Sequence, residues 1–181
     1  MTVGPEQIIS FWFREIDSKL WFQKSNQFDA LLTEKFLNVV NSAAACELWA
    51  WRSTSYGRLA EIIVLDQFSR NIFRGTQASF AQDRLALTLA QEAISQKVDD
   101  QFSTTEKSFL YMPYMHSESR LVHEEAVKLF AKTGLEGGLD FELRHKAIIE
   151  RFGRYPHRNS ILGRESTSEE IEFLKTAGSS F

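Results

Sequence analysis

Cysteine, proline and glycine are all scarce in this chain, whose 181 residues include one Cys, three Pro and nine Gly. Cys46 has no second cysteine with which to form an intrachain disulfide, so we expect a reducing, cytoplasmic location. The low Pro and Gly content, beside 43% hydrophobic residues and 15 Phe, excludes a fibrous or disordered chain. The composition therefore predicts a globular protein that buries about 70% of the surface its unfolded chain exposes.

Long hydrophobic runs are absent as well. The uncharged stretch from Phe36 to Cys46 contains three polar residues and is shorter than the roughly 20 apolar residues of a membrane-spanning helix. The first residues, MTVGPEQIISFWFREID, lack a basic start followed by an apolar run. We expect no membrane partner and no secretory leader.

Positive charge is not in surplus either, since the formal net charge is -3 and the pI is about 5.8. General nucleic-acid binding needs a broad positive field and is not expected. One segment departs from this balance: Arg144–Arg164 holds six Lys or Arg residues and a single acid, Glu150. This one-sided run predicts a local site for a negatively charged group.

Apolar residues recur with helical spacing along nearly the whole chain. One such stripe follows the spacing i, i+3, i+4, i+8, i+11 and i+12 and is made by Phe28, Leu31, Leu32, Phe36, Val39 and Val40. Asn26 before them is a suitable N-cap. The same spacing predicts further inner stripes, made by Leu59, Ile62, Ile63 and Phe73, by Leu85, Ala86, Leu89, Ala90, Ala93 and Ile94, by Val122, Ala126, Leu129 and Phe130, and by Phe141, Ile148, Ile149 and Phe152.

Helix boundaries carry their own signals. Ser103 with Glu106, and Thr167 with Glu170, have capping-box spacing, and Gly153 is expected to end a helix. No strand alternation competes, and no linker-like tract divides the chain. The sequence predicts an all-α single domain over residues 1–181, with about eight or nine helices in antiparallel packing.

The first candidate site lies in LDQFSRNIFRG, where Asp66, Arg70 and Arg74 follow one another at i+4 with Asn71 beside them. One interpretation is a ligand-facing row in which Asp66 orients Arg70 while Arg74 and Asn71 donate hydrogen bonds to an anion. The other is an exposed Asp/Arg helix pair that contributes a few tenths of a kcal/mol.

The second candidate site is RFGRYPHRN, in which an irregular segment presents Arg154, His157, Arg158 and Asn159. Arginine offers planar donors for carboxylate or phosphate, and histidine adds a proton near neutral pH. Alternatively, these arginines cap helix carbonyls or pair with acids elsewhere in the chain. If both candidate sets serve one ligand, we expect Arg70 or Arg74 to lie near 154–159.

Other reactive residues suggest no further site. His145 falls on an inner helical stripe and is expected to be a hydrogen-bonded core histidine. His116, Arg120 and His123 do not have the spacing of a helical zinc pair. No metal or cofactor is predicted, and the catalytic residues of any reaction stay unknown. Trp21, Trp49 and Trp51 fill a core or face a dimer partner, which leaves an oligomer open.

Three motifs together resemble a bacterial family described as domain of unknown function 924: LDQFSRNIFRG, FLYMP followed by HSE, and RFGRYPHRNSILGRESTSEEIEFL. The early FWF with a later WF and the terminal GSSF also fit, so the resemblance extends over nearly the whole chain. It implies a tetratricopeptide-like helical fold. It assigns no catalytic residue.

Three functions fit these features. The first is a helical protein that binds a small anionic ligand or an acidic peptide terminus at the two candidate sets. The second is an enzyme that acts on an anionic metabolite, with His116 or His157 as acid/base. The third is a structural or partner-binding module in which the arginines are internal struts.

Overall fold

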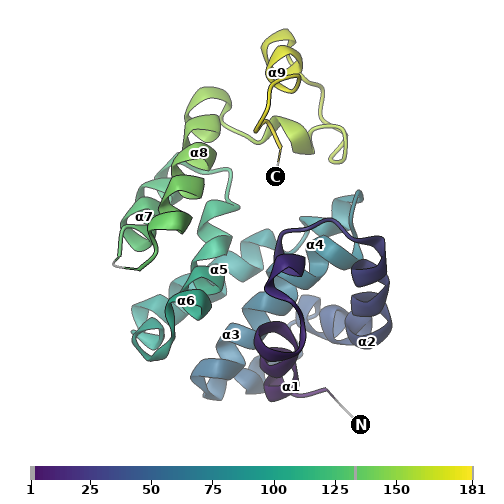
Figure 1. Ribbon diagram of the computed structural model, residues 1–181, viewed down its shortest axis with the longest axis vertical. Helices are drawn as coiled ribbons and strands as arrows, with labels where there is room; N and C mark the ends of the chain where they lie inside the picture. The colour runs from purple at the N-terminus through teal and green to yellow at the C-terminus, as the bar shows by residue number, and fades with distance from the viewer. Residues whose placement is uncertain (1–2, 133, 181) are drawn as a thin grey trace. The chain divides into compact units, whose positions relative to one another are not determined.

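The computed structural model describes residues 3–132 and 134–180, and this part of the chain contains helices and turns but no strand (Figure 1). The all-α fold class predicted from the sequence is confirmed. None of the described helices is long and apolar enough to cross a membrane. The α-helices are α1 (Pro5–Ser10), α2 (Asn26–Ala44), α3 (Ser55–Ile63), α4 (Ser69–Ile72), α5 (Asp83–Ser95), α6 (Thr104–Met115), α7 (Arg120–Phe130), α8 (Glu136–Phe152) and α9 (Ser168–Phe173).

Two compact units make up the chain. The first comprises the residues up to Arg74 together with Ala78–Pro113, and the second comprises Gly75–Gln77 and the residues from Tyr114 onward. The expectations of a single domain over 1–181 and of tetratricopeptide-like antiparallel packing stay predictions.

Aromatic side chains build the core of the first unit. The fully buried Trp12 lies in a π-helical segment, Phe11–Glu15, that continues α1. Its ring centroid is 5.5 Å from that of Phe68 and 5.6 Å from that of Phe109. These edge-to-face and tilted contacts are the geometries that aromatic rings prefer, so they fix the start of the chain against α6 and the segment after α3.

Gly57 allows a close backbone approach in the same unit. It lies in the first turn of α3, where Thr54 Oγ1 accepts a hydrogen bond from its N–H at 3.0 Å. A Cβ atom at this position would be 1.9 Å from the carbonyl oxygen of Trp51. Since no real Cβ contact is that short, any side chain here must displace the 3₁₀ turn Trp49–Ser53.

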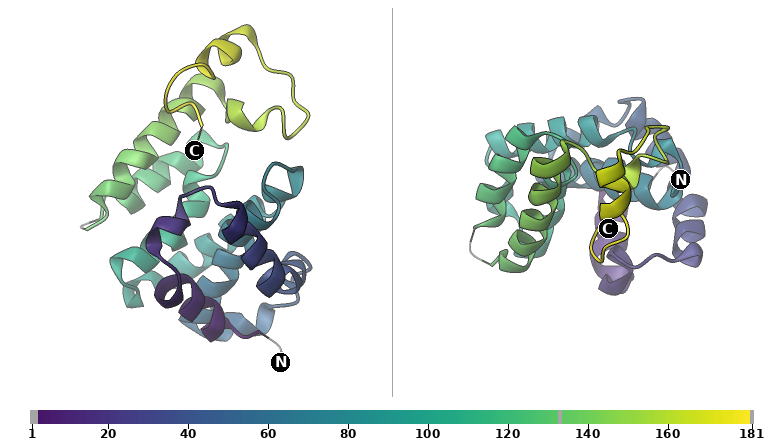
Figure 2. Two further views of the ribbon diagram at one scale, coloured as in Figure 1. Left: turned by 45° about the vertical axis from the view of Figure 1, so that its right-hand side comes forward. Right: turned by 90° about the horizontal axis from the view of Figure 1, so that it is seen from above.

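The second unit is built around α7 and α8, which lie side by side in Figures 1 and 2. Their buried residues include the apolar Ala126, Phe130 and Ile149, but also the polar His123 and Glu142. The prediction that Phe141 belongs to the inner stripe is wrong, because its side chain is 58% exposed. Glu142 takes the inward position instead, because its carboxylate pairs with His123 across the two helices.

Helix ends follow the sequence signals with one exception. Gly153 ends α8 in the left-handed conformation, at φ 71°, and the Thr167–Glu170 capping box begins α9. Both were predicted. The N-cap of α2 is Ser25 and not Asn26, since Ser25 Oγ accepts the hydrogen bond from the N–H of Phe28.

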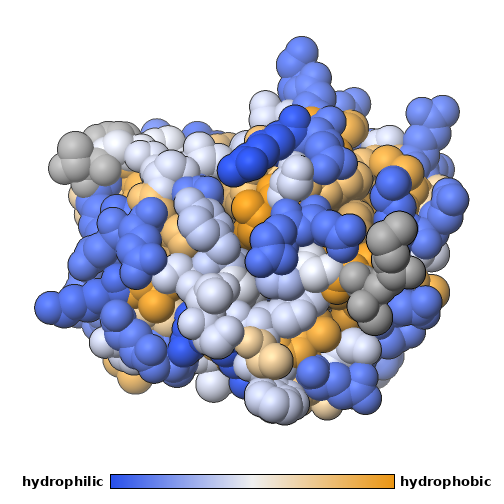
Figure 3. Space-filling model, turned by 90° about the horizontal axis from the view of Figure 1, so that it is seen from below, coloured by the Kyte–Doolittle hydropathy of each residue, from blue (hydrophilic) through white to orange (hydrophobic). Residues whose placement is uncertain are grey.

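The molecular surface mixes hydrophobic and hydrophilic residues. On the face drawn in Figure 3, hydrophobic residues form small areas that hydrophilic side chains separate. The most exposed large hydrophobic side chains include Phe22, Trp49 and Leu121. Scattered exposure of this kind is common on globular proteins and does not by itself indicate an interface.

We predict that Gly57→Ala destabilises the protein by about 1–3 kcal/mol, because the new Cβ overlaps backbone that is already packed. Gly137→Ala is the matched control: it lies in α8, a Cβ there would meet nothing within 4 Å, and alanine favours a helix over glycine. Thermal unfolding of both variants beside the wild type measures the difference. Equal melting temperatures for Gly57→Ala and the wild type would contradict the close approach.

Candidate functional site

Tyr155 lies at the centre of the polar network in the second unit. Its side chain is fully buried, and its hydroxyl donates to the carbonyl oxygen of Met115 at 2.6 Å. The same hydroxyl oxygen is 3.2 Å from Nε2 of His123. The backbone N–H of Tyr155 donates to Glu118 at 2.8 Å, so one residue joins the end of α6, α7 and the turn after α8.

Arg164 pairs with Glu118 beside this tyrosine. Its two terminal nitrogens donate to the two carboxylate oxygens at 2.7 and 2.9 Å, and its Nε donates to Asn159 Oδ1 at 2.9 Å. Burial disfavours the charge on Glu118, but the hydrogen bonds from Arg164 and Tyr155 outweigh it and lower the pKa of the carboxyl. The pair therefore stays charged and closes the 155–164 loop.

Arg154 forms a second fork, with Glu170 of α9. Its Nε and one terminal nitrogen donate to the two carboxylate oxygens at 2.7 and 2.8 Å, and it also donates to the carbonyl oxygen of Glu165 at 2.8 Å. The backbone N–H of Thr167 donates to the same carboxylate at 2.8 Å. These hydrogen bonds, that from Arg154 above all, lower the pKa of Glu170 to about 2.

The remaining predicted residues of this set also contact their own unit. Arg158 is 6% exposed, and its guanidinium carbon lies 4.5 Å from the ring centroid of Tyr155. Asn159 is fully buried and donates to Ser166 Oγ at 3.1 Å, and the half-buried His157 lies against the Tyr155 ring. Internal pairing thus accounts for much of the positive charge in the 144–164 run.

The predicted set in LDQFSRNIFRG lies in the first unit. Arg70 contacts Asp66 and Asp83, each at 2.9 Å, and Arg74 forms a fork with Asp29 at 2.6 and 2.9 Å. Asn71 Oδ1 accepts a further hydrogen bond from Arg74 at 2.7 Å.

The interpretation of this set as an exposed Asp/Arg pair is wrong for Asp66, which is 1% exposed. The two candidate sets belong to different units, so their convergence on one ligand stays a prediction.

The buried histidines are structural, as predicted for His145. Its Nδ1 is 2.7 Å from the carbonyl oxygen of Phe141, and burial lowers its pKa to about 3. His123 lies 2.6 Å from Glu142, whose pKa burial raises although the histidine opposes this shift. Over residues 3–132 and 134–180, no group of three or more His, Cys, Asp or Glu is placed to hold a metal ion.

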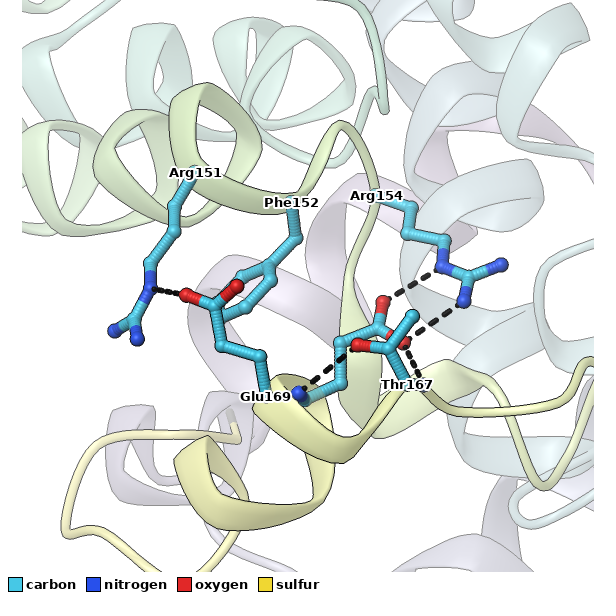
Figure 4. A pocket seen from close by; sticks show the side chains of 6 residues that line it. Arg151, Phe152, Arg154, Thr167 and Glu169 are labelled. Atoms are coloured by element: carbon cyan, nitrogen blue, oxygen red, sulfur yellow. Dashed lines mark hydrogen bonds and ion pairs between the residues drawn. The ribbon is translucent and has the colours of Figure 1, made fainter.

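An open depression of about 370 Å³ lies where α8 ends and α9 begins (Figure 4). It is lined by Arg151, Phe152, Arg154, Thr167, Glu169 and Glu170. Figure 4 shows Arg151 reaching from α8 toward Glu169, with Arg154 on the other side of Phe152. Arg151 Nε donates to Glu169 at 2.8 Å, and the two side chains are 52% and 62% exposed.

Arg151 belongs to the basic run 144–164 but is not among the site residues predicted from the sequence. The available signal was its place two residues before the helix-ending Gly153, which puts its side chain at the rim of α8.

Glu170 makes the stability of the fold decrease at acid pH. Because the pKa of Glu170 in the folded protein, about 2, is below the value near 4.5 of a free glutamate, its contribution to the free energy of unfolding is present above pH 4.5 and is lost as the pH falls toward 2.

We predict that Glu170→Gln destabilises the protein at pH 7 and flattens this acid dependence. Urea unfolding at pH 7 and pH 3 measures it, with the exposed Glu172→Gln as control. An unchanged acid slope in Glu170→Gln would contradict the assignment.

Comparison with known proteins agrees with this picture of a helical fold. No curated protein matches the chain. A solved structure of a protein of unknown function from Agrobacterium tumefaciens is similar, with 37% sequence identity, a TM-score of 0.90, and coverage of 94% of this chain and 96% of that one. The model of the bacterial family of unknown function DUF924 matches residues 8–178. The resemblance noted in the sequence is therefore confirmed, and the chain belongs to the DUF924 family.

Proposed function

We propose that this protein is a helical binding module that takes an anionic ligand, a small acid or an acidic peptide terminus, at the depression beside Arg151. The observation that carries the proposal is the contrast between its two arginines. Arg154 is held in a fork by a carboxylate that is 2% exposed, whereas Arg151 pairs with a carboxylate that is 62% exposed. A ligand can reach Arg151 without opening the interior of the unit.

Replacing Glu169 by a ligand carboxylate on Arg151 has a small energetic cost. Exposed ion pairs contribute about 0–1 kcal/mol, because water solvates both partners almost as well as they solvate each other. A ligand carboxylate can therefore replace Glu169 on the guanidinium. Replacing Glu170 on Arg154 would leave a carboxylate that is 2% exposed without its cation, and this costs more than exchange at an exposed pair.

The alternative of a structural or partner-binding module is favoured by the other arginines. Arg154, Arg158 and Arg164 all make their described contacts inside the second unit, as struts would. The two roles are compatible in one chain, since the struts shape the depression that Arg151 borders. We also propose a cytoplasmic location, which the single free Cys46 supports.

We predict that Arg151→Ala weakens the binding of carboxylate probes by about twofold to fivefold, since an ion pair at an exposed arginine contributes about 0–1 kcal/mol. Arg144→Ala is the matched control, because Arg144 is an exposed arginine of the same helix that lies over the Phe141 ring. Titration of citrate, glutarate and acetylated acidic peptides, followed by thermal shift, measures both variants.

Salt dependence provides a second readout of the same site. At an exposed arginine, affinity should fall as ionic strength rises, because the Debye length is about 8 Å at physiological salt. Equal loss of binding in Arg144→Ala, or preference for an uncharged amide analogue, would reject Arg151 as the recognition group.

A further inference from the structure

Two neighbouring glutamates of α9 are held in different ways. Glu170 is 2% exposed, accepts two hydrogen bonds from Arg154, and closes the capping box with Thr167. Glu169 is 62% exposed and accepts one hydrogen bond, from Arg151. The position of α9 is therefore fixed by Glu170, and the Glu169 side chain can leave Arg151 while the helix stays in place.

Arg151 also keeps its position without Glu169. Its guanidinium carbon lies 4.7 Å from the ring centroid of Phe152 and 5.7 Å from that of Phe173. The two rings pack together with centroids 4.9 Å apart, so they form one apolar surface under the cation. Cation–π contacts of this kind orient an exposed arginine. The site is preorganised on its cationic side.

We propose that Glu169 is an internal competitor that occupies the ligand's place on Arg151, and that the ligand is a peptide segment presenting a glutamate side chain. This inference rests on the proposed function. The occupant seen on Arg151 is a carboxylate on a two-carbon arm, carried by a polypeptide and placed beside the Phe152–Phe173 surface. A partner peptide with the same arm reproduces that contact and adds its neighbouring residues to the apolar surface.

The contact between Glu169 and Arg151 thereby lowers affinity in the unliganded protein. Any ligand carboxylate must first displace Glu169, so its binding free energy is reduced by what the internal pair contributes. Removing the competing charge while keeping the shape of the side chain should raise the affinity. Glutamine does this, since its amide oxygen is a weaker acceptor for a guanidinium than a carboxylate.

The test is titration of a fluorescent peptide, acetyl-Ala-Ala-Glu-Ala-Ala-amide, against wild type, Glu169→Gln and Glu172→Gln. Glu172 is the matched control, because it is an exposed glutamate of the same helix that pairs with Lys175. We expect Glu169→Gln to tighten binding about twofold to fivefold, which is the range of an exposed ion pair. Glu172→Gln should leave the affinity unchanged. Arg151→Ala combined with Glu169→Gln should abolish the gain.

Two further probes identify the ligand class. The same peptide with Gln in place of Glu should not bind, and free glutarate should bind more weakly than the peptide because it lacks the neighbouring residues. Glutarate binding as tightly as the peptide would overturn the peptide assignment and leave a small acid.

The outcomes separate this inference from the proposed function. If the peptide binds wild type and Glu169→Gln equally, Glu169 is not a competitor, whereas anion binding at Arg151 stands. If neither protein binds any carboxylate probe, the proposed function fails and the competitor model fails with it. Thermal unfolding of Glu169→Gln near the wild-type temperature confirms that α9 stays anchored by Glu170.

Discussion

Neutralisation of charge around the buried Tyr155 is the interaction on which the second unit depends. Glu118 precedes α7, Arg154 and Arg164 follow α8, and Glu170 lies in α9, so the two forks join segments that are far apart in the sequence. Because an isolated charge at such a site is costly, each partner constrains the other's position. The tyrosine hydroxyl, its N–H and its ring then fix where the forks meet.

Exposure decides which charges can also recognise a ligand. Pairs with a buried carboxylate, such as Arg154 with Glu170, hold the fold, because a ligand that replaced Glu170 on Arg154 would leave that carboxylate buried without its cation. Pairs at the rim, such as Arg151 with Glu169, contribute little to the fold and exchange easily. In the proposed function, the structural and the recognition role therefore belong to two arginines that are three positions apart in the sequence, Arg154 and Arg151.

Local patterns in the sequence predicted the helices and their ends, because spacing and caps are properties of a few adjacent residues. The capping box at Thr167 and the glycine end of α8 are examples. The inward face of α8 could not be predicted from its hydrophobic spacing, since the polar Glu142 lies there paired with His123, 19 residues earlier in the chain. Phe141 was assigned to the interior for that reason, although a polar pair occupies the interface between the two helices.

The role of the basic run depended on contacts of still longer range. Arg164 pairs with Glu118, which lies 46 residues earlier in the sequence. The charge of a local segment cannot predict so distant a partner. A surplus of one sign predicts only that opposite charge must come from somewhere, either from the chain or from a ligand. The distinction lies in burial of the carboxylate: where the chain supplies a buried one, the arginine becomes a strut. Arg151 differs because the rings of Phe152 and Phe173 already orient its guanidinium. The carboxylate of Glu169 therefore balances the charge of Arg151 but is not needed to fix its position. An arginine held in this way is the one whose partner a ligand can replace.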